Sequence, residues 1–330
     1  MQSIFLPALQ KTTSKLGIGL AAAGRPGYIT LEHGADLNFA YGLDDMESQA
    51  HKLLDQAWEL GIRYIDLARS YGQAEAFTAS WLAKYPDRAS ELVIGSKWGY
   101  TYTADWKIDA EHHEIKDHTL PVFQRQIQES QSLLGDHLDM YHIHSATLDS
   151  GVLDRPEVLS ALADLKSQGV AVGLSLSGSN QDQTLEQALQ VEVDGTPLFQ
   201  SVQATWNVLE TSVGHFLEAA HQAGWVVIIK EGVANGRLTD KNRPNPEAFW
   251  SAIDTEVLRH QTSVDAWALA GILARPWVDI VLSGAVRAEH LAQNAQSLSI
   301  QWDDQAEAVL TEILETPERY WQTRKQLPWN

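Results

Sequence analysis

Residues 50–68 read AHKLLDQAWELGIRYIDLA and place a helix pattern directly before a strand pattern. Apolar residues recur at the 3.6-residue spacing of one helix face, at Ala50, Leu53, Leu54, Ala57 and Leu60. Gly61 follows, at the point where an ending helix needs a residue that can adopt the left-handed conformation. The next apolar run, residues 64–68, then predicts a short strand.

Helix patterns and candidate strands alternate almost to the end of the chain. A second helix pattern, Val158-Leu159-Leu162-Leu165, also closes on a glycine, Gly169. We expect strands at residues 16–20, 64–68, 92–98, 138–144, 170–177, 201–207, 225–230 and 279–284. Such alternation is typical of a parallel sheet covered by helices.

The number of these units favours one barrel over two domains. No linker-like stretch divides the chain. We therefore expect an α/β fold of the closed (β/α)8 TIM barrel type, rather than a doubly wound sheet with a second domain. A single domain would span residues 1–330, with the barrel core at about 15–300 and an extension at 301–330. Residues 303–315 have the pattern of one extra amphipathic helix in that extension.

The composition describes a folded protein with an acidic surface. Of 330 residues, 44% are apolar and 20% are charged, which excludes disorder and collagen-like repeats. The sum of 24 Lys+Arg and 43 Asp+Glu leaves a formal net charge of −19, so we expect neither nucleic acid nor an anionic membrane as a partner. The absence of cysteine excludes disulfides and thiolate nucleophiles. The first ten residues lack a secretory pattern, so we expect a cytoplasmic enzyme.

Polar residues stand at the ends of three successive predicted strands. Asp66 lies near the end of the second strand, and Tyr71 follows in the next turn. Lys97 lies near the end of the third strand and His144 ends the fourth. Active sites of such barrels lie at the carboxyl ends of the strands, so these four side chains are expected to converge.

The stretch GIRYIDLARSYG, residues 61–72, resembles the most specific motif of the aldo-keto reductase superfamily. Residues 94–97 (IGSK), 138–144 (LDMYHIH) and 282–285 (LSGA) are similar to the family's later motifs. The resemblance covers roughly residues 15–300. It implies a reversible reduction of an aldehyde or ketone that depends on NADP(H) or NAD(H). The family's Asp, Tyr, Lys and His tetrad falls on Asp66, Tyr71, Lys97 and His144.

These four residue types suit carbonyl reduction. A tyrosine with a pKa near 10 donates a proton slowly at neutral pH unless a cation assists it. An ammonium ~4 Å from tyrosinate interacts with it by roughly 4 kcal/mol, so Lys97 is expected to lower the pKa of Tyr71. Asp66 would keep Lys97 charged, and His144 would hydrogen-bond the carbonyl oxygen.

A glycine-containing stretch near the N-terminus matches a dinucleotide-binding pattern only in part. Gly17-Ile-Gly19-Leu-Ala-Ala22 fits the dinucleotide pattern G-x-G-x-x-A, but Gly24, Pro26 and Gly27 prevent the helix that this pattern requires. We expect Gly19 instead to let the backbone lie close under a ligand. The resemblance places the cofactor across the mouth of the barrel, in contact with Gly19, Ser175, Gln203, Lys230, Gly232, Leu238, Gly284, Ala285, Arg287 and Asn294.

The chain departs from the family pattern at two cofactor positions. The family's Ser-Asn pair after the fifth strand is Ser175-Leu176 here. The aromatic residue that many members place on the seventh strand is replaced by Lys230, and Trp206 is a candidate substitute. Arg287 is the basic residue next to the expected adenosine end, so the sequence favours NADPH, with NADH as the alternative.

Two long connections, 24–43 and 99–119, follow strands and are expected at the catalytic face. Aromatic residues in or near these connections, Tyr28, Trp98, Tyr100 and Trp106, are candidates for the wall of the substrate pocket. The expected partner is a small carbonyl compound, and no obligate protein partner is evident.

Two other functions remain open at this point. One is a cofactor-binding, redox-sensing barrel with slow turnover, similar to the β subunits of voltage-gated potassium channels. The other is a zinc hydrolase that uses His142 and His144, although two histidines without a third ligand are a weak signal and no metal is expected. We expect His142 to be a hydrogen-bonded interior residue, and His112 and His113 to be solvated or at most to touch the edge of the substrate.

Overall fold

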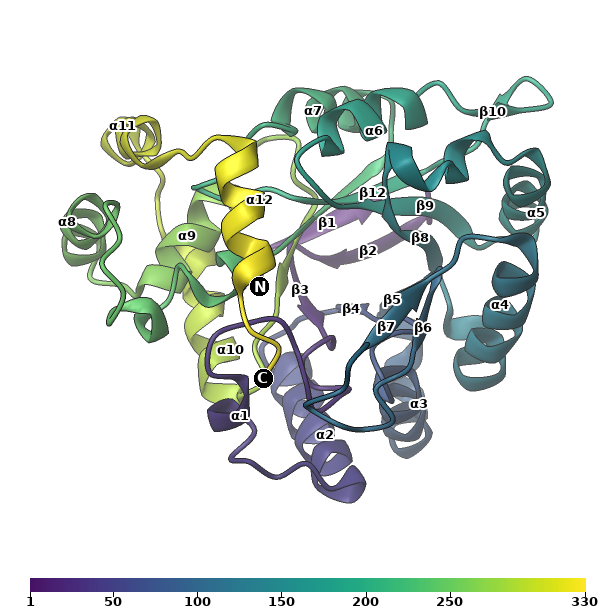
Figure 1. Cartoon of the computed structure of the whole chain (residues 1–330), viewed down its shortest axis with the longest axis horizontal. Coiled ribbons are helices and arrows are strands. Elements are labelled where there is room, and N and C mark those ends of the chain that lie inside the picture. The colour runs from purple at the N-terminus through teal and green to yellow at the C-terminus, as the bar shows by residue number, and fades with distance from the viewer.

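The computed structural model describes residues 1–330, and eight parallel strands form a closed barrel at its centre (Figure 1). The last strand pairs with the first, where Leu282 lies opposite Gly17, and this pairing closes the ring. The barrel strands are β3 (Leu16–Gly19), β4 (Tyr64–Asp66), β5 (Val93–Trp98), β8 (Met140–Ala146), β9 (Ala171–Leu176), β12 (Ser201–Thr205), β13 (Val226–Lys230) and β14 (Ile280–Ser283). The predicted (β/α)8 barrel is confirmed, and each strand end lies within two residues of its expected position.

Helices return the chain from each strand to the next and cover the outside of the barrel. They are α2 (Leu43–Glu59), α3 (Ala74–Lys84), α4 (Leu120–Leu134), α5 (Pro156–Ser167), α6 (Gln181–Ala188), α7 (Gly214–Gln222), α9 (Val264–Leu273) and α10 (Ala288–Ala295). The two glycines expected to end α2 and α5 have positive φ, +80° at Gly61 and +95° at Gly169. Strands β5 and β9 are buried at every residue, because side chains cover both faces of the sheet.

A hairpin that the sequence did not suggest closes the amino-terminal end of the barrel. It consists of β1 (Ser3–Leu6) and β2 (Lys11–Ser14). Leu6 belongs to a buried cluster that also contains the first residues of β4, β5, β8, β9 and β13. In Figure 1 the hairpin is seen through the barrel, to the right of the last helix of the chain, which crosses the near side. The open mouth is therefore at the carboxyl ends of the strands.

The C-terminal extension holds two helices, α11 (Asp304–Ile313) and α12 (Pro317–Gln326), where the sequence suggested one. The second has little apolar pattern, since Tyr320 and Trp321 are its only buried residues. After α12 the chain returns to the mouth of the barrel. There Trp329 forms a β-bridge with Ile29. The other helices and strands outside the barrel are α1 (His33–Asp36), α8 (Trp250–His260), β6 (Tyr100–Tyr102), β7 (Glu114–Lys116), β10 (Glu192–Val193) and β11 (Thr196–Pro197).

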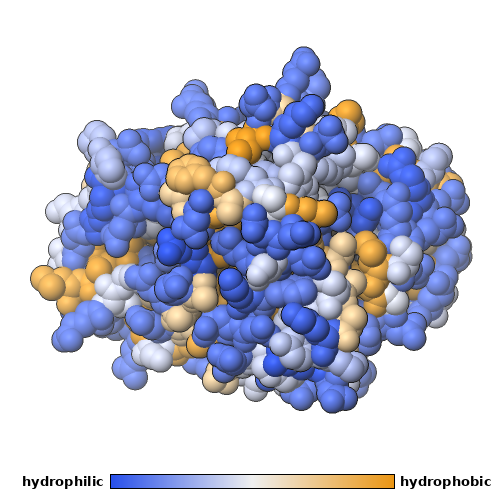
Figure 2. Space-filling model, turned by 90° about the horizontal axis from the view of Figure 1, so that it is seen from below, coloured by the Kyte–Doolittle hydropathy of each residue, from blue (hydrophilic) through white to orange (hydrophobic).

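The surface reflects the acidic composition. The face seen in Figure 2 is mostly hydrophilic, and its apolar residues form small separate groups. Leu258 and Phe39 are the most exposed large apolar side chains. None of the helices is both long and apolar enough to cross a lipid bilayer.

Candidate active site

A cavity of about 390 Å³ opens at the carboxyl ends of the strands. The last residues of four strands line it: Gly19 of β3, Asp66 of β4, Lys230 of β13 and Ser283 of β14. The two long loops expected at this face also contribute wall residues, and so does the end of the chain, through Trp329. These contributions come from segments far apart in the sequence, so the cavity forms only when the barrel closes.

Lys97 lies under the cavity and connects three of its neighbours. Its Nζ donates to Oδ2 of Asp66 at 2.6 Å, to the carbonyl oxygen of Leu67 at 2.9 Å and to Oη of Tyr71 at 3.1 Å. The side chain is fully buried, so all three donors of the ammonium are satisfied without water. Burial lowers the pKa of Lys97, and the Asp66 carboxylate opposes this shift because it stabilises the ammonium.

Tyr71 lies in the turn after β4 and presents its hydroxyl to the cavity. Its ring meets the His144 ring edge to face, with centroids 5.6 Å apart. Burial and the nearby Asp66 carboxylate raise the pKa of Tyr71 well above 10. The pKa of Tyr71 is therefore raised overall despite the Lys97 ammonium beside it, whereas the sequence led us to expect a net lowering. The reason is that Asp66 neutralises the ammonium at contact distance, and the buried phenol has little water to stabilise its anion.

His144 extends from β8 into the cavity beside Tyr71. The pairing of β8 with β9 shifts register between Ile143 and Ala146, and Ser145 in this bulge has φ +53°. The Nδ1 of His144 and Oγ of Ser70 lie 3.4 Å apart, and Nε2 has no hydrogen-bond partner within the protein. Burial and the cations of Lys97 and Lys230 lower the pKa of His144 well below 6.5. The imidazole is therefore neutral at pH 7 and can donate one hydrogen bond.

Gln203 of β12 connects the tetrad to the opposite side of the barrel. Its Nε2 donates to Oδ1 of Asp66 at 2.7 Å. Its Oε1 faces no hydrogen-bond donor although the residue is fully buried and lines the cavity. An unpaired buried carbonyl oxygen of this kind fits an amide N–H₂ group of a bound molecule.

A charged cluster from β13 and α12 forms another wall. Lys230 donates to Oγ1 of Thr205 at 3.0 Å, and burial lowers its pKa to about 8. The neighbouring Glu231 accepts hydrogen bonds from Nε and Nη2 of Arg324. Burial raises the pKa of Glu231, but Arg324 and Lys230 outweigh it and hold this pKa at about 2.

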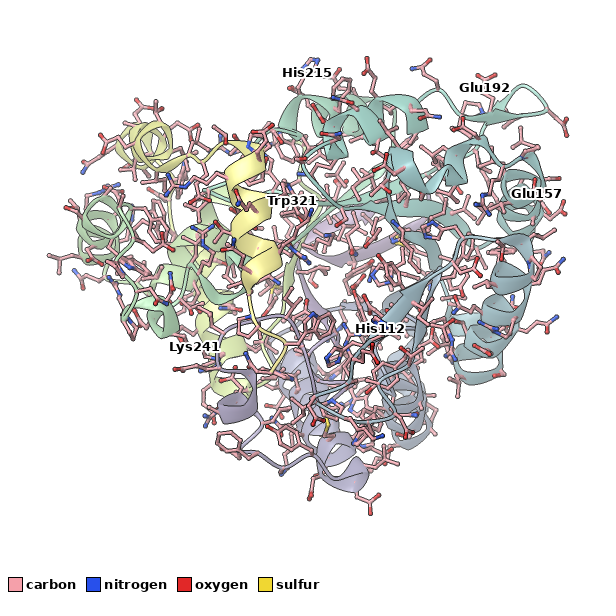
Figure 3. The ribbon with its side chains drawn as sticks, in the orientation of Figure 1. His112, Glu157, Glu192, His215, Lys241 and Trp321 are labelled. Carbon is pink, nitrogen blue, oxygen red and sulfur yellow. The ribbon has the colours of Figure 1, made fainter.

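The end of the cavity away from Tyr71 is built by the loop after β13, the first turn of α9 and one side of α10. Asn294 accepts a hydrogen bond from Oγ of Ser283 and donates one to Asp265. Gly284 has no atom near the position that a Cβ would occupy, so the wall is open there. Gly232 and Ala285 also line the cavity. Lys241, labelled in Figure 3 beside α1, forms an ion pair with Asp36 across this end.

Three expected cofactor residues do not line the cavity. The Oγ of Ser175 is buried and accepts a hydrogen bond from the backbone N–H of Ser145 at 2.8 Å. Leu238 is fully buried in a hydrophobic cluster behind the wall. Arg287 lies outside the wall with 41% of its side chain exposed, 3.6 Å from Glu289. The position of Arg287 in the sequence did not reveal that its side chain points away from the cavity.

Two of the four aromatic residues expected in the pocket wall also lie elsewhere. Trp98 is fully buried, packed edge to face on His118 and Phe123. Trp106 donates its indole N–H to the carbonyl oxygen of Tyr41 instead of facing the cavity. Tyr28 and Tyr100 do line the cavity. Trp206, the candidate substitute for the missing aromatic residue, is buried against Trp277 and is a core residue.

Several wall residues had no signal in the sequence, among them Arg25, Arg324 and Trp329. Arg25 is almost fully buried, donates to the Ser70 carbonyl oxygen and to Glu114, and lies over the ring of Tyr71. Trp329 comes from the last residues of the chain. Arg25 and Trp329 reach the site through loop geometry, which no periodic pattern encodes.

Of the three other histidines considered in the sequence analysis, His142 and His113 have structural contacts and His112 is exposed. His142 is buried and lies 2.8 Å from Oγ of Ser201 through Nε2, as expected for an interior residue. His112 is exposed as expected, whereas His113 stacks on the Trp329 ring at 4.2 Å. No third ligand joins His142 and His144, so the zinc hydrolase has no support in the geometry.

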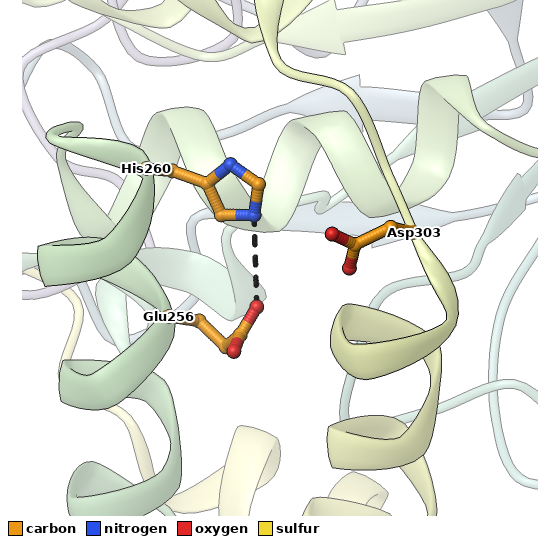
Figure 4. A group of neighbouring side chains, drawn as sticks. All are labelled: Glu256, His260 and Asp303. Carbon is orange, nitrogen blue, oxygen red and sulfur yellow. Dashed lines mark ion pairs between the residues drawn. The ribbon is translucent and has the colours of Figure 1, made fainter.

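One group of acidic and histidine side chains lies outside the cavity. It comprises Glu256, His260 and Asp303 between α8 and α11 (Figure 4). The guanidinium of Arg259 donates to both Glu256 and Asp303, so it already neutralises the carboxylates. Asp303 also caps α11 by accepting from Ala306 N. This group is an ion-pair network that joins the two helices.

The glycine pattern near the N-terminus does not form a dinucleotide-binding helix. After β3 the chain continues in turns, and the next helix is the short α1. Gly19 lines the cavity, as expected for a close backbone approach, and a Cβ there would lie 3.7 Å from the Ser283 carbonyl oxygen.

Comparison with known proteins agrees with this geometry. The model of the aldo/keto reductase family matches residues 41–315. The chain belongs to this family. Its members are oxidoreductases that use nicotinamide cofactors on small carbonyl substrates.

Relatives of this aldo/keto reductase are distant but cover most of its length. An NADH-specific methylglyoxal reductase of Escherichia coli is 23% identical over 97% of this chain and 100% of its own. A D-threo-aldose 1-dehydrogenase of a Pseudomonas species is 22% identical over 80% of this chain and 89% of its own. An aldo-keto reductase from Bacillus halodurans, solved in its holo form, superposes with a TM-score of 0.71 at 20% identity. That structure covers 96% of this chain and 97% of its own, and it shows that the two share a fold.

Proposed function

We propose that this protein catalyses the reversible reduction of an aldehyde or ketone to an alcohol with a nicotinamide dinucleotide. The observation that carries the proposal is the position of Lys97, whose ammonium joins Asp66 and Tyr71 directly beneath the cavity. Tyr71 and His144 line the cavity side by side, so both can reach one oxygen atom of a bound molecule. A cytoplasmic location, suggested by the sequence, belongs to the same proposal.

The wall residues fit a nicotinamide dinucleotide. The unpaired Oε1 of Gln203 suits a carboxamide group, and the open wall at Gly284 leaves room for the other end of a long ligand. Gly19, Lys230, Gly232, Ala285 and Asn294 would complete the contacts. When bound, the cofactor supplies or accepts the hydride. Arg287 no longer supports a preference for NADPH, because its side chain lies outside the cavity.

Tyr71 would transfer the proton. Its raised pKa keeps the phenol protonated at neutral pH, so a donor is present when negative charge develops on the substrate oxygen. Because Oη of Tyr71 accepts from Lys97, its own hydrogen is free to point into the cavity. The neutral His144 would donate a second hydrogen bond to the same oxygen through Nε2.

The substrate would lie between the tetrad and the returning chain end. Tyr28, Tyr100 and Trp329 give this part of the cavity aromatic faces, and Arg25 and Glu114 add charged groups. Such a wall suits a small carbonyl compound with both apolar and hydrogen-bonding parts. The names of the two relatives, which mention methylglyoxal and an aldose, agree with that class.

Replacement of the Tyr71 hydroxyl tests the proposal. Tyr71→Phe removes only the proton donor, so we expect turnover on a panel of simple aldehydes to fall at least about a hundredfold, with dinucleotide affinity unchanged. If the variant keeps more than a tenth of wild-type turnover when chemistry limits the rate, Tyr71 is not the donor. If the wild type oxidises its bound cofactor only once and turns over no carbonyl, the redox-sensing function is correct instead.

A further inference from the structure

The cavity wall contains four lysine and arginine side chains, and they are distributed unevenly. Arg25, Lys230 and Arg324 stand near the tetrad, and each has a carboxylate nearby. The other end of the cavity has only Lys241, which forms an ion pair with Asp36. We call that end the distal end. It is formed by Asp36, Asp240, Lys241, Asp265, His290 and Asn294.

Carboxylates outnumber cations at the distal end. Asp36, Asp240 and Asp265 line this end with a single lysine, and Asp240 also pairs with Arg243, which does not line the cavity. Contacts link the group, since His290 lies 3.9 Å from Asp36 and Asn294 donates to Asp265. The two arginines nearest in sequence do not line the cavity and are held by carboxylates, Arg243 by Asp240 and Asp254 and Arg287 by Glu289. No cation at this end is therefore free to meet an anionic ligand.

This charge balance bears on the two nicotinamide dinucleotides, which differ by one phosphate at the adenosine ribose. Discrimination in favour of the phosphate requires a free cation, whereas a carboxylate accepts a hydrogen bond from the 2′-hydroxyl. Under the proposed function the nicotinamide lies at the tetrad and the adenosine at the distal end. We propose that the distal end selects NADH over NADPH, with Asp265 and the Asp36–Lys241 pair as the residues that set the preference.

Asp265 and Asp36 affect the nucleotide preference in different ways. Asp265 stands in the first turn of α9, where it adds negative charge to the wall and can accept a hydroxyl hydrogen. Asp36 removes the one available cation, because its carboxylate holds the Lys241 ammonium. A 2′-phosphate at this end would meet like charge and no free partner.

Equilibrium binding measured by calorimetry tests the inference without enzyme turnover. On the wild-type protein we expect the Kd for NADH to be at least about tenfold lower than the Kd for NADPH. Asp36→Asn frees the Lys241 ammonium, so it should tighten NADPH about tenfold or more and change NADH little. Asp265→Asn should weaken NADH and reduce the discrimination.

Two matched variants complete the experiment. In the Asp36→Asn background, Lys241→Met should abolish the gain for NADPH, because the freed cation is then absent. Arg287→Ala should change neither Kd. If the wild type binds NADPH as tightly as NADH or more tightly, the inference is overturned and the proposed function stands. The same conclusion follows if Arg287→Ala loses affinity for NADPH alone. If neither nucleotide binds, the proposed function fails and this inference fails with it.

Discussion

Arg324, on the last helix of the chain, donates hydrogen bonds from Nε and Nη2 to the carboxylate of Glu231 at the end of β13. The same carboxylate accepts from Oγ1 of Thr205, and the Glu231 carbonyl oxygen accepts from Asn207. Helix α12 is thus fixed to the wall of the cavity by charge as well as by the buried rings of Tyr320 and Trp321. The C-terminal extension is part of the site.

The contact of Arg324 with Glu231 predicts a stability effect. Arg324→Ala leaves a buried carboxylate with only Lys230 as a cation nearby, so the free energy of unfolding should fall by about 3 kcal/mol. Arg319→Ala removes an exposed arginine from the same helix and should change stability by less than about 0.5 kcal/mol. Urea titrations of both variants measure the difference. Similar values for the two would show that the ion pair does not hold the helix.

Lys97→Met should change the pH dependence of alcohol oxidation, the direction in which Tyr71 must accept a proton. With the ammonium gone, Asp66 acts on the tyrosinate without opposition, so the apparent pKa in the kcat/KM profile should rise further. Lys97→Arg keeps a cation and should leave the position of the profile nearer that of the wild type, even if its rate falls. An unchanged profile in Lys97→Met, with altered affinity alone, would assign Lys97 to binding or structure.

His144 should act as a neutral donor. Since burial and neighbouring cations hold its pKa well below 6.5, the kcat/KM for carbonyl reduction should show no inflection from this residue between pH 6 and pH 8. His144→Ala should lower kcat/KM by about a hundredfold to a thousandfold, the range typical for loss of one hydrogen bond to a developing oxyanion. A wild-type inflection near pH 6.5 that disappears in the variant would contradict the neutral form.

The barrel and its tetrad follow from local patterns in the sequence. Eight apolar runs separated by helix periods require a closed sheet, and side chains at the strand ends must then meet at one mouth. Asp66, Tyr71, Lys97 and His144 are brought together for this reason. The hairpin of β1 and β2 was not predicted, because its segment has no clear apolar pattern. Leu6 is buried only through its contact with the end of the barrel.

The remaining wall residues depend on loop geometry. Arg25, Trp329 and Arg324 reach the cavity from segments that only the tertiary fold brings to the mouth. Conversely, Trp98 and Arg287 stand at suitable sequence positions but their side chains point elsewhere. Side chains at the ends of barrel strands point in a direction that the strand geometry fixes, whereas loop side chains do not. Sequence reasoning therefore located the tetrad but misplaced part of the cavity wall.

The lowered pKa of Lys230 predicts how cofactor affinity depends on pH. Its Nζ lines the cavity and burial lowers its pKa to about 8 in the free protein. Under the proposed function an anionic dinucleotide would favour the charged form and raise this pKa. The affinity should then be constant below pH 8 and fall by up to about tenfold per pH unit above it, until the pKa of the complex is reached.

The same linkage requires a proton to be taken up when the nucleotide binds above pH 8, and calorimetry in buffers of different ionisation enthalpy measures that uptake. Lys230→Met should bind about tenfold more weakly at pH 7, show no such pH dependence and take up no proton. Lys84→Met, which alters an exposed lysine on α3, serves as the control and should behave as the wild type. If the wild-type affinity stays constant from pH 7 to pH 9.5, the ammonium of Lys230 does not face the anionic part of the ligand, and its assignment to the cofactor must be withdrawn.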